Sequence, residues 1–438
     1  MKSLTNFFVK VAQKYLPDAF LFAIGLTLIA FFMALGLTGK TVIEILSSWG
    51  NGLWGLLAFS MQMTLVLITG HAMASSPAIK NTLKAIASVP KTPVQGIMMT
   101  AFVAALASWV NWGFGLVVGA LLAREVAKRI RGVDYGMLVA AAYSGFVVWH
   151  GGISGSIPLA IATKGHIVEK LVGIIPVSRT IFAPFNLIIS FTMIVALPIL
   201  FYFMARKKDN VTQVDPALLE DEVPAAEPAV KTPASRLENS RIVTWILSLL
   251  GFAYLVYHFV SKGFDLNLNI VITIFMFVGI LLHGRPIAYV RAIEQAIKGA
   301  GGIALQFPLY GGIQGIMIGT GLAGIIAQWF ISISSPETFP LFTFLSGGII
   351  NFFVPSGGGQ WAVQGPINIP AGQALGVDPA VVAMSIAYGD QWTNMVQPFW
   401  ALPLLGIAKL GIRDIMGYCI MTLLASGVIF TLGLLIFT

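Results

Sequence analysis

Apolar stretches of about 20 residues recur along the chain, and they limit its fold more than any other feature. A helix of that length crosses a hydrocarbon core of about 30 Å. Hydrophobic residues make up 57% of the sequence and charged residues only 10%, against roughly 25% charged in average soluble proteins. We therefore predict an all-α polytopic membrane protein in contact with a lipid bilayer.

The apolar stretches predict about nine transmembrane helices. They lie near residues 18–37, 52–73, 135–163, 180–204, 242–260, 268–284, 301–330, 380–406 and 413–437. Two further apolar segments, 93–131 and 339–376, are broken at their centres by Asn111-Trp-Gly-Phe-Gly115 and Pro355-Ser-Gly-Gly-Gly359. We interpret both as re-entrant hairpins, which enter and leave the membrane on the same side.

The distribution of positive charge predicts the orientation of the chain. If the N-terminal segment 1–17 is cytoplasmic, few of the 26 Lys and Arg residues fall in outer segments. Those few are Lys40, Lys164, Lys170, Arg179 and Lys262. Such a bias is typical of cytoplasmic loops, and a single crossing by 93–131 would weaken it. Because this bias accounts for the net charge of +8, we expect no nucleic-acid partner.

The two halves of the chain repeat each other. Ala142-Tyr143 and Ala387-Tyr388 are each followed by a proline fifteen residues after the tyrosine, and each pair follows an asparagine-containing break. The repeats cover 18–204 and 268–437, and the charge pattern gives them opposite orientations. Inverted repeats with interrupted helices are typical of secondary transporters.

Two segments lie between these repeats. Residues 205–241 are rich in proline and acidic residues, a composition that cannot bury a core, so we predict a flexible cytoplasmic linker. Residues 242–260 are predicted to form an extra joining helix.

The break in the second hairpin has the chemistry of an anion site. A proline there breaks the helix, three glycines allow close approach to the backbone, and the returning arm begins with unpaired N–H groups and a partial positive charge. The first hairpin offers a similar glycine series. We predict the substrate-binding residues Asn111, Gly113, Gly115, Ser154, Ser156, Asn351, Ser356, Gly357, Gly358, Gly359, Gln360 and Trp361.

Glycines in membrane helices also serve close packing. This alternative is the better one for Gly311, Gly315 and Gly319, which are spaced every four residues. Three consecutive glycines form no packing ridge, so the alternative is weaker for the second hairpin.

A carboxylate inside a predicted span is costly and indicates function. Asp390, with Thr393 and Asn394 close behind it, offers oxygens for a coupling proton or sodium ion; the alternative is that Asp390 only caps a half-helix. His150 lies beside the matching break, where a lone histidine is more often a hydrogen-bonded structural group. We expect no cofactor or bound metal beyond the coupling ion, and the lone Cys419 makes a cysteine metal site implausible.

The substrate class follows from what the predicted spans contain. No Lys or Arg falls near the middle of any of them, which fits a small monovalent anion better than a dicarboxylate or phosphate. Aromatic residues near the tips, among them Trp112 and Trp361, offer walls for a short acyl chain, although aromatic residues in membrane helices more often pack against lipid or each other.

The chain closely resembles the bacterial short-chain fatty acid transporter family, of the acetoacetate and butyrate uptake type. The resemblance covers nearly the whole chain, and its motifs include Lys91-Thr-Pro-Val-Gln-Gly96, Gly152-Ile-Ser-Gly-Ser156, Pro355-Ser-Gly-Gly-Gly359, Ala387-Tyr-Gly-Asp-Gln-Trp392 and Gln397-Pro-Phe-Trp-Ala-Leu-Pro403. It implies a small monocarboxylate substrate, a homodimer with scaffold and mobile transport domains, and elevator-type movement. It also implies a bacterial inner membrane, in which nine spans and a cytoplasmic N-terminus place the C-terminus on the periplasmic side. Relatives are expected to have Glu in place of Asp390 and Gly in place of His150.

Two other classes of function remain as alternatives. The same hairpin tips would suit a passive small-anion channel. A membrane-embedded hydrolase is disfavoured, because the sequence has no Gly-x-Ser-x-Gly elbow and no HExxH zinc motif, so we expect no enzyme activity. The residues do not choose among acetate, butyrate, acetoacetate and other small carboxylates.

Overall fold

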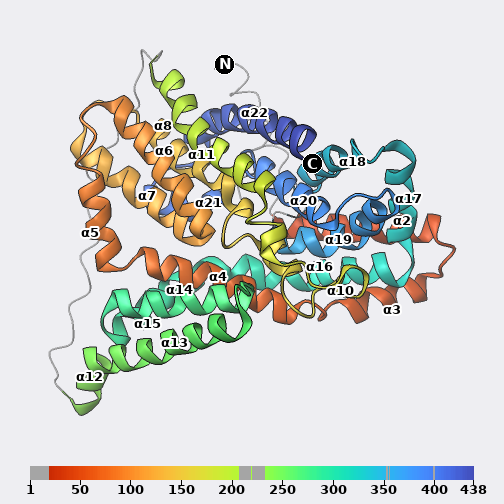
Figure 1. Ribbon diagram of the computed structural model, residues 1–438, viewed down its shortest axis with the longest axis horizontal. Coiled ribbons are helices and arrows are strands. Elements are labelled where there is room, and N and C mark those ends of the chain that lie inside the picture. Colours follow the sequence, from red (N-terminus) through yellow and green to blue (C-terminus); the bar gives the residue numbers. More distant parts are fainter. Residues whose placement is uncertain (1–18, 207–218, 220–231, 352–353, 355, 398–399) are drawn as a thin grey trace.

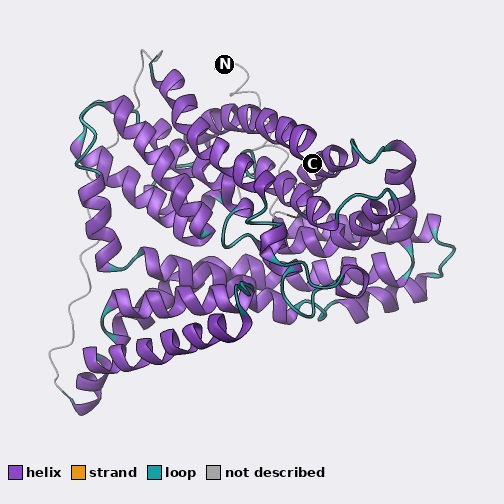
Figure 2. Ribbon diagram, in the orientation of Figure 1, coloured by secondary structure: helices purple, strands orange, loops and turns teal. Residues whose placement is uncertain are grey.

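The computed structural model describes residues 19–206, 219 and 232–438, apart from 352–353, 355 and 398–399. Within these residues the chain forms α-helices and short 3-10 helices and no strand (Figure 2). The predicted all-α class is confirmed. The predicted N-terminal segment 1–17 and most of the predicted linker lie outside the described residues.

Six helical segments of the described chain are long and apolar enough to cross a membrane. They are Leu57–Ala74, Pro93–Val110, Tyr135–Ile161, Pro184–Ala205, Arg241–Lys262 and Ile412–Phe437. The bent pair Pro286–Gly319 and Leu322–Ile333 makes a seventh if it is taken as one span. Shorter apolar helices occupy Ala23–Leu37, Leu268–His283 and Phe339–Asn351. The predicted spans 18–37 and 268–284 fall on the first two of these helices, and the predicted span 301–330 falls on the bent pair.

Three predicted segments differ from the structure. The predicted span 380–406 is divided between two helices, α20 (Pro379–Thr393) and α21 (Ala401–Ala408). The predicted span 301–330 is not one helix: α16 (Gly301–Gly319) ends at a left-handed Gly321 (φ +80°), and α17 (Leu322–Ile333) then leaves at 78° to the helical segment before it. A glycine in this conformation is a common helix terminator. The predicted linker is helical near its end, where α12 (Pro233–Glu238) begins at a capping box on Thr232.

The helices form two layers (Figure 1). The α4–α16 layer contains α2 (Ala19–Leu37), α3 (Val42–Gly52), α4 (Leu57–Ala74), α13 (Arg241–Lys262), α14 (Leu268–His283), α15 (Pro286–Ala296) and α16. The α6–α20 layer contains α6 (Pro93–Val110), α7 (Trp112–Arg129), α8 (Tyr135–Ser144), α11 (Pro184–Ala205), α18 (Phe339–Asn351), α19 (Gly357–Ala374), α20 (Pro379–Thr393), α21 (Ala401–Ala408) and α22 (Ile412–Phe437). Each layer includes helices from both halves of the chain. Short helix α5 (Pro77–Ile86) connects α4 to the second layer.

Glycines let α3 and α16 approach until their backbones touch. A Cβ added at Gly52 would meet the Gly311 carbonyl oxygen and lie 2.8 Å from Gly315 Cα, and one added at Gly319 would lie 2.7 Å from Ser48 Oγ. The packing role predicted for the glycine series of α16 is therefore confirmed. Such close approach is a main source of helix association in membranes.

The start of α3 is fixed by a capping box. Thr41 Oγ1 accepts from the Glu44 N–H, and Glu44 accepts in return from the Thr41 N–H at 2.8 Å. This backbone hydrogen bond, assisted by Lys40, lowers the pKa of Glu44 to about 2.

Hydrogen bonds between distant segments hold the α6–α20 layer together. Tyr135 donates to the Ala408 carbonyl at 2.9 Å, and the hydroxyls of Ser144 and Thr422 lie 2.8 Å apart. Both contacts are buried, where an unpaired partner would be costly, so the two halves of the chain are fastened to each other within this layer.

Candidate functional site

Four helix interruptions lie close together in the chain's fold, and two of them, at Asn111 and before Gly357, lie against the α4–α16 layer. They lie at Asn111, at residues 152–155, between Asn351 and Gly357, and after Thr393, where residues 394–397 are not helical. The second follows η1 (Gly145–Gly151) and precedes α9 (Ser156–Ile161). The breaks predicted from glycine, proline and amide residues are therefore present in both halves of the chain.

Polar side chains of the first half accept hydrogen bonds from two N–H groups of the first tip. Asn111 Oδ1 accepts from the Phe114 N–H at 2.8 Å, and Ser154 Oγ accepts from the Trp112 N–H at 3.0 Å. These bonds satisfy two of the N–H groups that the start of α7 leaves without acceptors in the helix. Asn111 and Ser154 thus brace the tip, and Ser156 lies buried at the first position of α9.

The glycines of the first tip lie against backbone. A Cβ at Gly113 would lie 2.9 Å from the Leu67 carbonyl oxygen in α4, and one at Gly115 would lie 2.5 Å from Ser108 Cα. Gly113 therefore allows α7 to touch the α4–α16 layer, and Gly115 allows α6 and α7 to touch each other.

The second tip begins α19 and remains more open. Ser356 is the N-cap residue, and its Oγ accepts from the Gly359 N–H at 3.4 Å. The N–H groups of Gly357 and Gly358 precede the first intrahelical bond and need acceptors from outside the helix. Pro355, predicted to break this helix, lies outside the described residues.

The three glycines of the second tip each face different ring side chains. A Cβ at Gly357 would lie 2.5 Å from His150 Cε1 and 2.9 Å from Trp149 Cη2. At Gly358 it would lie 2.6 Å from Phe59 Cε1 in α4, and at Gly359 it would lie 2.5 Å from Tyr310 Cδ2 in α16. The tip thus touches the end of η1 on one side and the α4–α16 layer on the other.

Gln360, the next predicted residue, forms hydrogen bonds within the hairpin. Gln360 Nε2 donates to the Gly347 carbonyl at 2.9 Å and to Gln364 Oε1 at 2.7 Å, which ties α19 to α18. The indole of Trp361 is 1% exposed, and its Nε1 has no hydrogen-bond partner among the described residues.

Asn351 gathers the predicted coupling residues into one buried cluster. Its Nδ2 lies 2.9 Å from the Asp390 carbonyl oxygen, 2.9 Å from Thr393 Oγ1 and 3.0 Å from Asn394 Oδ1. Asn394 Nδ2 donates to Asp390 Oδ1 at 3.0 Å, and Asp390 Oδ2 has no partner among the described residues. Three acceptors share the two hydrogens of one amide, so the cluster has more oxygens than donors, as suits a sodium ion or a proton.

Two tyrosines brace the break of the opposite half, and sequence reasoning used them only as repeat markers. Tyr143 donates to the Asn394 carbonyl at 2.7 Å, within the second-half break. Tyr388 donates to Asn186 Oδ1 at 2.8 Å, and Asn186 donates to the Gly151 carbonyl at 2.9 Å, beside the first-half break. Nothing in the sequence singled out Asn186 except its position after a proline in an apolar stretch.

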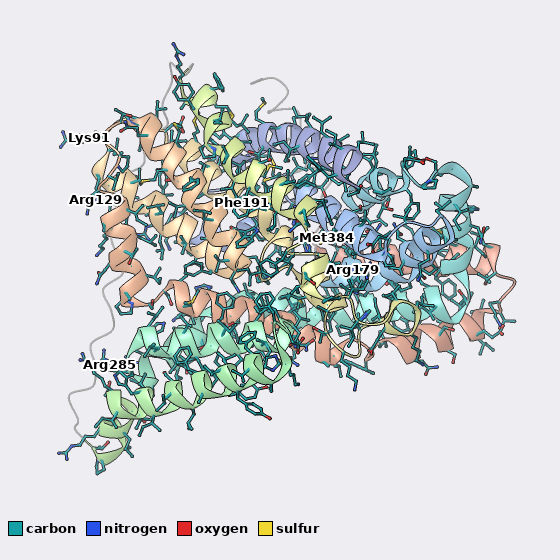
Figure 3. The ribbon with its side chains drawn as sticks, in the orientation of Figure 1. Lys91, Arg129, Arg179, Phe191, Arg285 and Met384 are labelled. Carbon is teal, nitrogen blue, oxygen red and sulfur yellow. The ribbon has the colours of Figure 1, made fainter. Side chains whose placement is uncertain are left out.

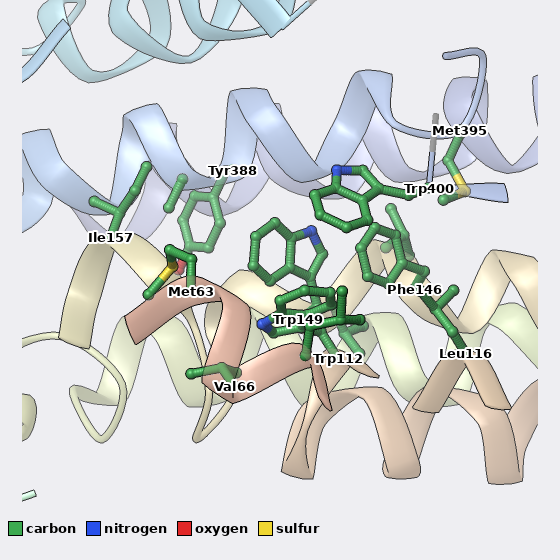
Figure 4. Close-up of a cluster of buried hydrophobic side chains, with 14 of the residues drawn as sticks. Met63, Val66, Trp112, Leu116, Phe146, Trp149, Ile157, Tyr388, Met395 and Trp400 are labelled. Atoms are coloured by element: carbon green, nitrogen blue, oxygen red, sulfur yellow. The ribbon is translucent and has the colours of Figure 1, made fainter. Parts of the chain in front are cut away.

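An aromatic cluster adjoins the breaks (Figure 4). Trp112 packs on Trp149 with ring centroids 5.8 Å apart and on Trp400 at 4.9 Å, and Phe146 stacks on Trp149 at 5.3 Å. All four rings are buried. The N–H groups of the second tip therefore lie beside an apolar wall.

Comparison with known proteins identifies the family. The family model for short chain fatty acid transporters matches residues 1–437. The chain belongs to the short-chain fatty acid transporter family. It is 51% identical to a candidate short-chain fatty acid transporter of Escherichia coli (strain K12) over 436 residues, 99% of each chain. A similarly named protein of Haemophilus influenzae (strain ATCC 51907 / DSM 11121 / KW20 / Rd) is 46% identical over 440 residues, 98% of each.

The fold is similar to that of a solved transporter. The YdaH transporter of Alcanivorax borkumensis superimposes with a TM-score of 0.58 at 16% identity, over 95% of this chain and 98% of that one. With several helices suited to crossing a membrane, this member of a transporter family is a multi-pass membrane protein. The family predicted from the sequence motifs is confirmed.

Proposed function

We propose that the chain is a secondary active transporter of short-chain fatty acids such as butyrate or acetoacetate, coupled to protons or sodium. One observation carries the proposal: an open glycine-rich helix start lies beside an aromatic wall and an oxygen-rich break, between two helix layers. In a member of this family, these features match the three needs of carboxylate, acyl chain and coupling ion.

The second tip is the better place for the carboxylate. At the second tip the N–H groups of both Gly357 and Gly358 need outside acceptors, whereas at the first tip Trp112 and Phe114 already have acceptors and only the Gly113 N–H needs one. Helix starts with free N–H groups favour anions. In this arrangement Ser356 shapes the tip, and Gln360 and Trp361 hold the arm behind it. The first tip and the start of α9 would form the opposite side of the site, through the predicted residues Asn111, Gly113, Gly115, Ser154 and Ser156.

We assign the coupling proton or sodium ion to the cluster of Asp390, Thr393 and Asn394, with Asn351 beside it. The cluster adjoins the second tip through the buried His150, whose Nε2 lies 3.7 Å from Asp390 Oδ1. A cation there would lower the cost of bringing a second negative charge, the substrate carboxylate, into the same buried region.

Alternating access would come from movement of one layer against the other. The α6–α20 layer holds both tips and would be the mobile transport domain, and the α4–α16 layer would be the scaffold. Gly358 and Gly359 of the second tip lie against the rings of Phe59 in α4 and of Phe307 and Tyr310 in α16, a kind of contact that favours sliding over fixed polar attachment. The resemblance to the family extends the proposal to an elevator-type homodimer built from two inverted repeats with re-entrant hairpins.

The orientation proposal is a cytoplasmic N-terminus and periplasmic C-terminus in a bacterial inner membrane. Lys91, Arg129 and Arg285, all predicted to be cytoplasmic, lie toward one end of the molecule, and Arg179, predicted to be outside, lies away from it (Figure 3). A common end for these cations agrees with the expected excess of positive charge in cytoplasmic loops.

The test is uptake of labelled butyrate into liposomes that contain the purified protein. A sodium gradient and a pH gradient are imposed separately, with protein-free liposomes as the control. Accumulation against the butyrate gradient supports a coupled transporter, and the gradient that drives it names the ion. Flux that only equilibrates butyrate would support the channel alternative, and no flux under either gradient would refute the substrate assignment.

A further inference from the structure

His150 is a fully buried histidine whose ring has no hydrogen-bond partner among the described residues. Its backbone N–H donates to Gln391 Oε1 at 2.8 Å, so the second half of the chain fixes its position. The ring lies on Trp149, with centroids 3.6 Å apart. A buried polar group without a partner is costly, and such a group needs an explanation.

The imidazole is directed at the start of α19. A Cβ at Gly357 would collide with its Nε2 and lie 2.5 Å from Cε1, so the ring occupies the space that the missing side chain leaves. The N–H groups of Gly357 and Gly358 need acceptors from outside the helix, and the helix dipole makes this point positive. The imidazole ring therefore lies beside Gly357 at this helix start, with the Gly358 N–H in the same turn, and a neutral imidazole carries one N–H donor of its own.

The nearest acidic side chain does not satisfy the ring. Asp390 Oδ1 lies 3.7 Å from His150 Nε2, beyond hydrogen-bond distance, and it already accepts from Asn394. Trp149 borders the same position, with Cη2 2.9 Å from the added Cβ at Gly357. Grouped donors beside an aromatic face fit an anion with a short apolar tail.

We propose that His150 binds the substrate carboxylate together with the Gly357 and Gly358 N–H groups, and that Trp149 packs against the first acyl carbons. This inference rests on the proposed function and adds a residue that determines specificity. His150 donates one hydrogen bond to a carboxylate oxygen, and the second tip cannot provide that bond without it.

The test compares His150→Leu, which removes the donor, with His150→Gln, which keeps an N–H donor near the position of Nε2. The matched control is His258→Leu, because His258 is another buried histidine (4% exposed) but lies on α13 in the other layer. For each variant the KM for butyrate uptake is measured, together with the melting temperature in sodium butyrate and in sodium chloride.

We expect His150→Leu to raise the KM about tenfold or more, as for a lost hydrogen bond to a charged group, and to abolish the stabilisation by butyrate. Without butyrate it should melt no lower than the wild type, because it removes an unsatisfied polar group. His150→Gln should stay within about threefold of the wild-type KM, and His258→Leu should leave the KM unchanged.

A wild-type KM in His150→Leu would overturn the inference while the proposed function stands. Equal losses in the Leu and Gln variants, or a lower melting temperature with undiminished stabilisation by butyrate, would assign His150 a structural role and also overturn it. If the wild-type protein itself neither transports butyrate nor is stabilised by it, the proposed function fails and this inference fails with it.

Discussion

Replacing Gly358 with alanine tests whether the second tip must sit against the α4–α16 layer. The added Cβ would lie 2.6 Å from Phe59 Cε1, 2.9 Å from Phe59 Cζ and 3.2 Å from Phe307 Cζ. The first distance is 0.8 Å below the 3.4 Å at which ordinary van der Waals contact begins. Phe59 packs edge-on against Phe307, with centroids 6.0 Å apart, so Phe307 limits the movement of its ring on that side.

The cost of this overlap follows from overpacking. Extra methyl groups in a packed core cost about 1–3 kcal/mol, and alanine recovers up to about 1 kcal/mol over glycine in a helix. A net cost of about 1–2 kcal/mol reduces the population of the seated tip about 5- to 30-fold. We expect the initial rate of butyrate uptake by Gly358→Ala to fall by that factor.

Two variants make the measurement specific. Gly301 is the first residue of α16, as Gly357 is of α19, and nothing lies within 4 Å of a Cβ added there; Gly301→Ala should transport like the wild type. Phe59→Leu removes the two ring atoms in the overlap, so Phe59→Leu combined with Gly358→Ala should recover uptake to within about threefold of Phe59→Leu alone. An uptake rate for Gly358→Ala equal to that of Gly301→Ala would refute the reasoning. So would an uptake rate for the double variant no higher than that of Gly358→Ala, provided that Phe59→Leu alone is active.

Three further predictions concern the breaks and the packing of the layers. Tyr143→Phe leaves the buried Asn394 carbonyl without its 2.7 Å donor and should destabilise the protein by about 1–3 kcal/mol; an unchanged melting temperature would contradict a bracing role. Gly52→Ala should push α3 away from the α16 backbone, because Gly315 Cα lies 2.8 Å from the added Cβ. The variant should lose about 1–3 kcal/mol of stability in denaturation assays and keep the wild-type KM once folded. A changed KM with normal stability would contradict a packing role for Gly52. Asp390→Asn keeps the size of the side chain but removes its charge; gradient-driven accumulation should be lost while exchange of labelled for unlabelled butyrate persists, and continued accumulation would exclude Asp390 from coupling.

Part of the site was predictable because it depends on local chemistry. The break at Asn111 and the glycine tip of α19 follow from residues that terminate or cap helices wherever they occur. The grouping of Asp390, Thr393 and Asn394 was also predictable, because residues three and four apart share one helix face.

Other features depend on contacts between distant residues. His150 lies beside Gly357 although about 200 residues separate them in the sequence. Tyr143 and Asn394 likewise form a hydrogen bond across 251 positions. No local pattern reports such a contact, which explains why His150 looked like an ordinary structural histidine in the sequence. The bend after α16 was missed for a related reason, since Gly321 lies in an apolar stretch that otherwise fits one span.

The sequence by itself determined the helical class, the positions of the helix breaks and the family. The length of an apolar stretch, a helix-breaking residue and a family motif are all properties of contiguous residues, so they can be recognised in the sequence alone. Only the tertiary structure decided which tip is open, which break each tyrosine braces, and which aromatic rings face the glycines of α19. These features depend on how the two layers pack. A hydrogen-bond donor is satisfied only if another part of the chain places an acceptor beside it, and a glycine is necessary only if another part of the chain leaves no room for a side chain.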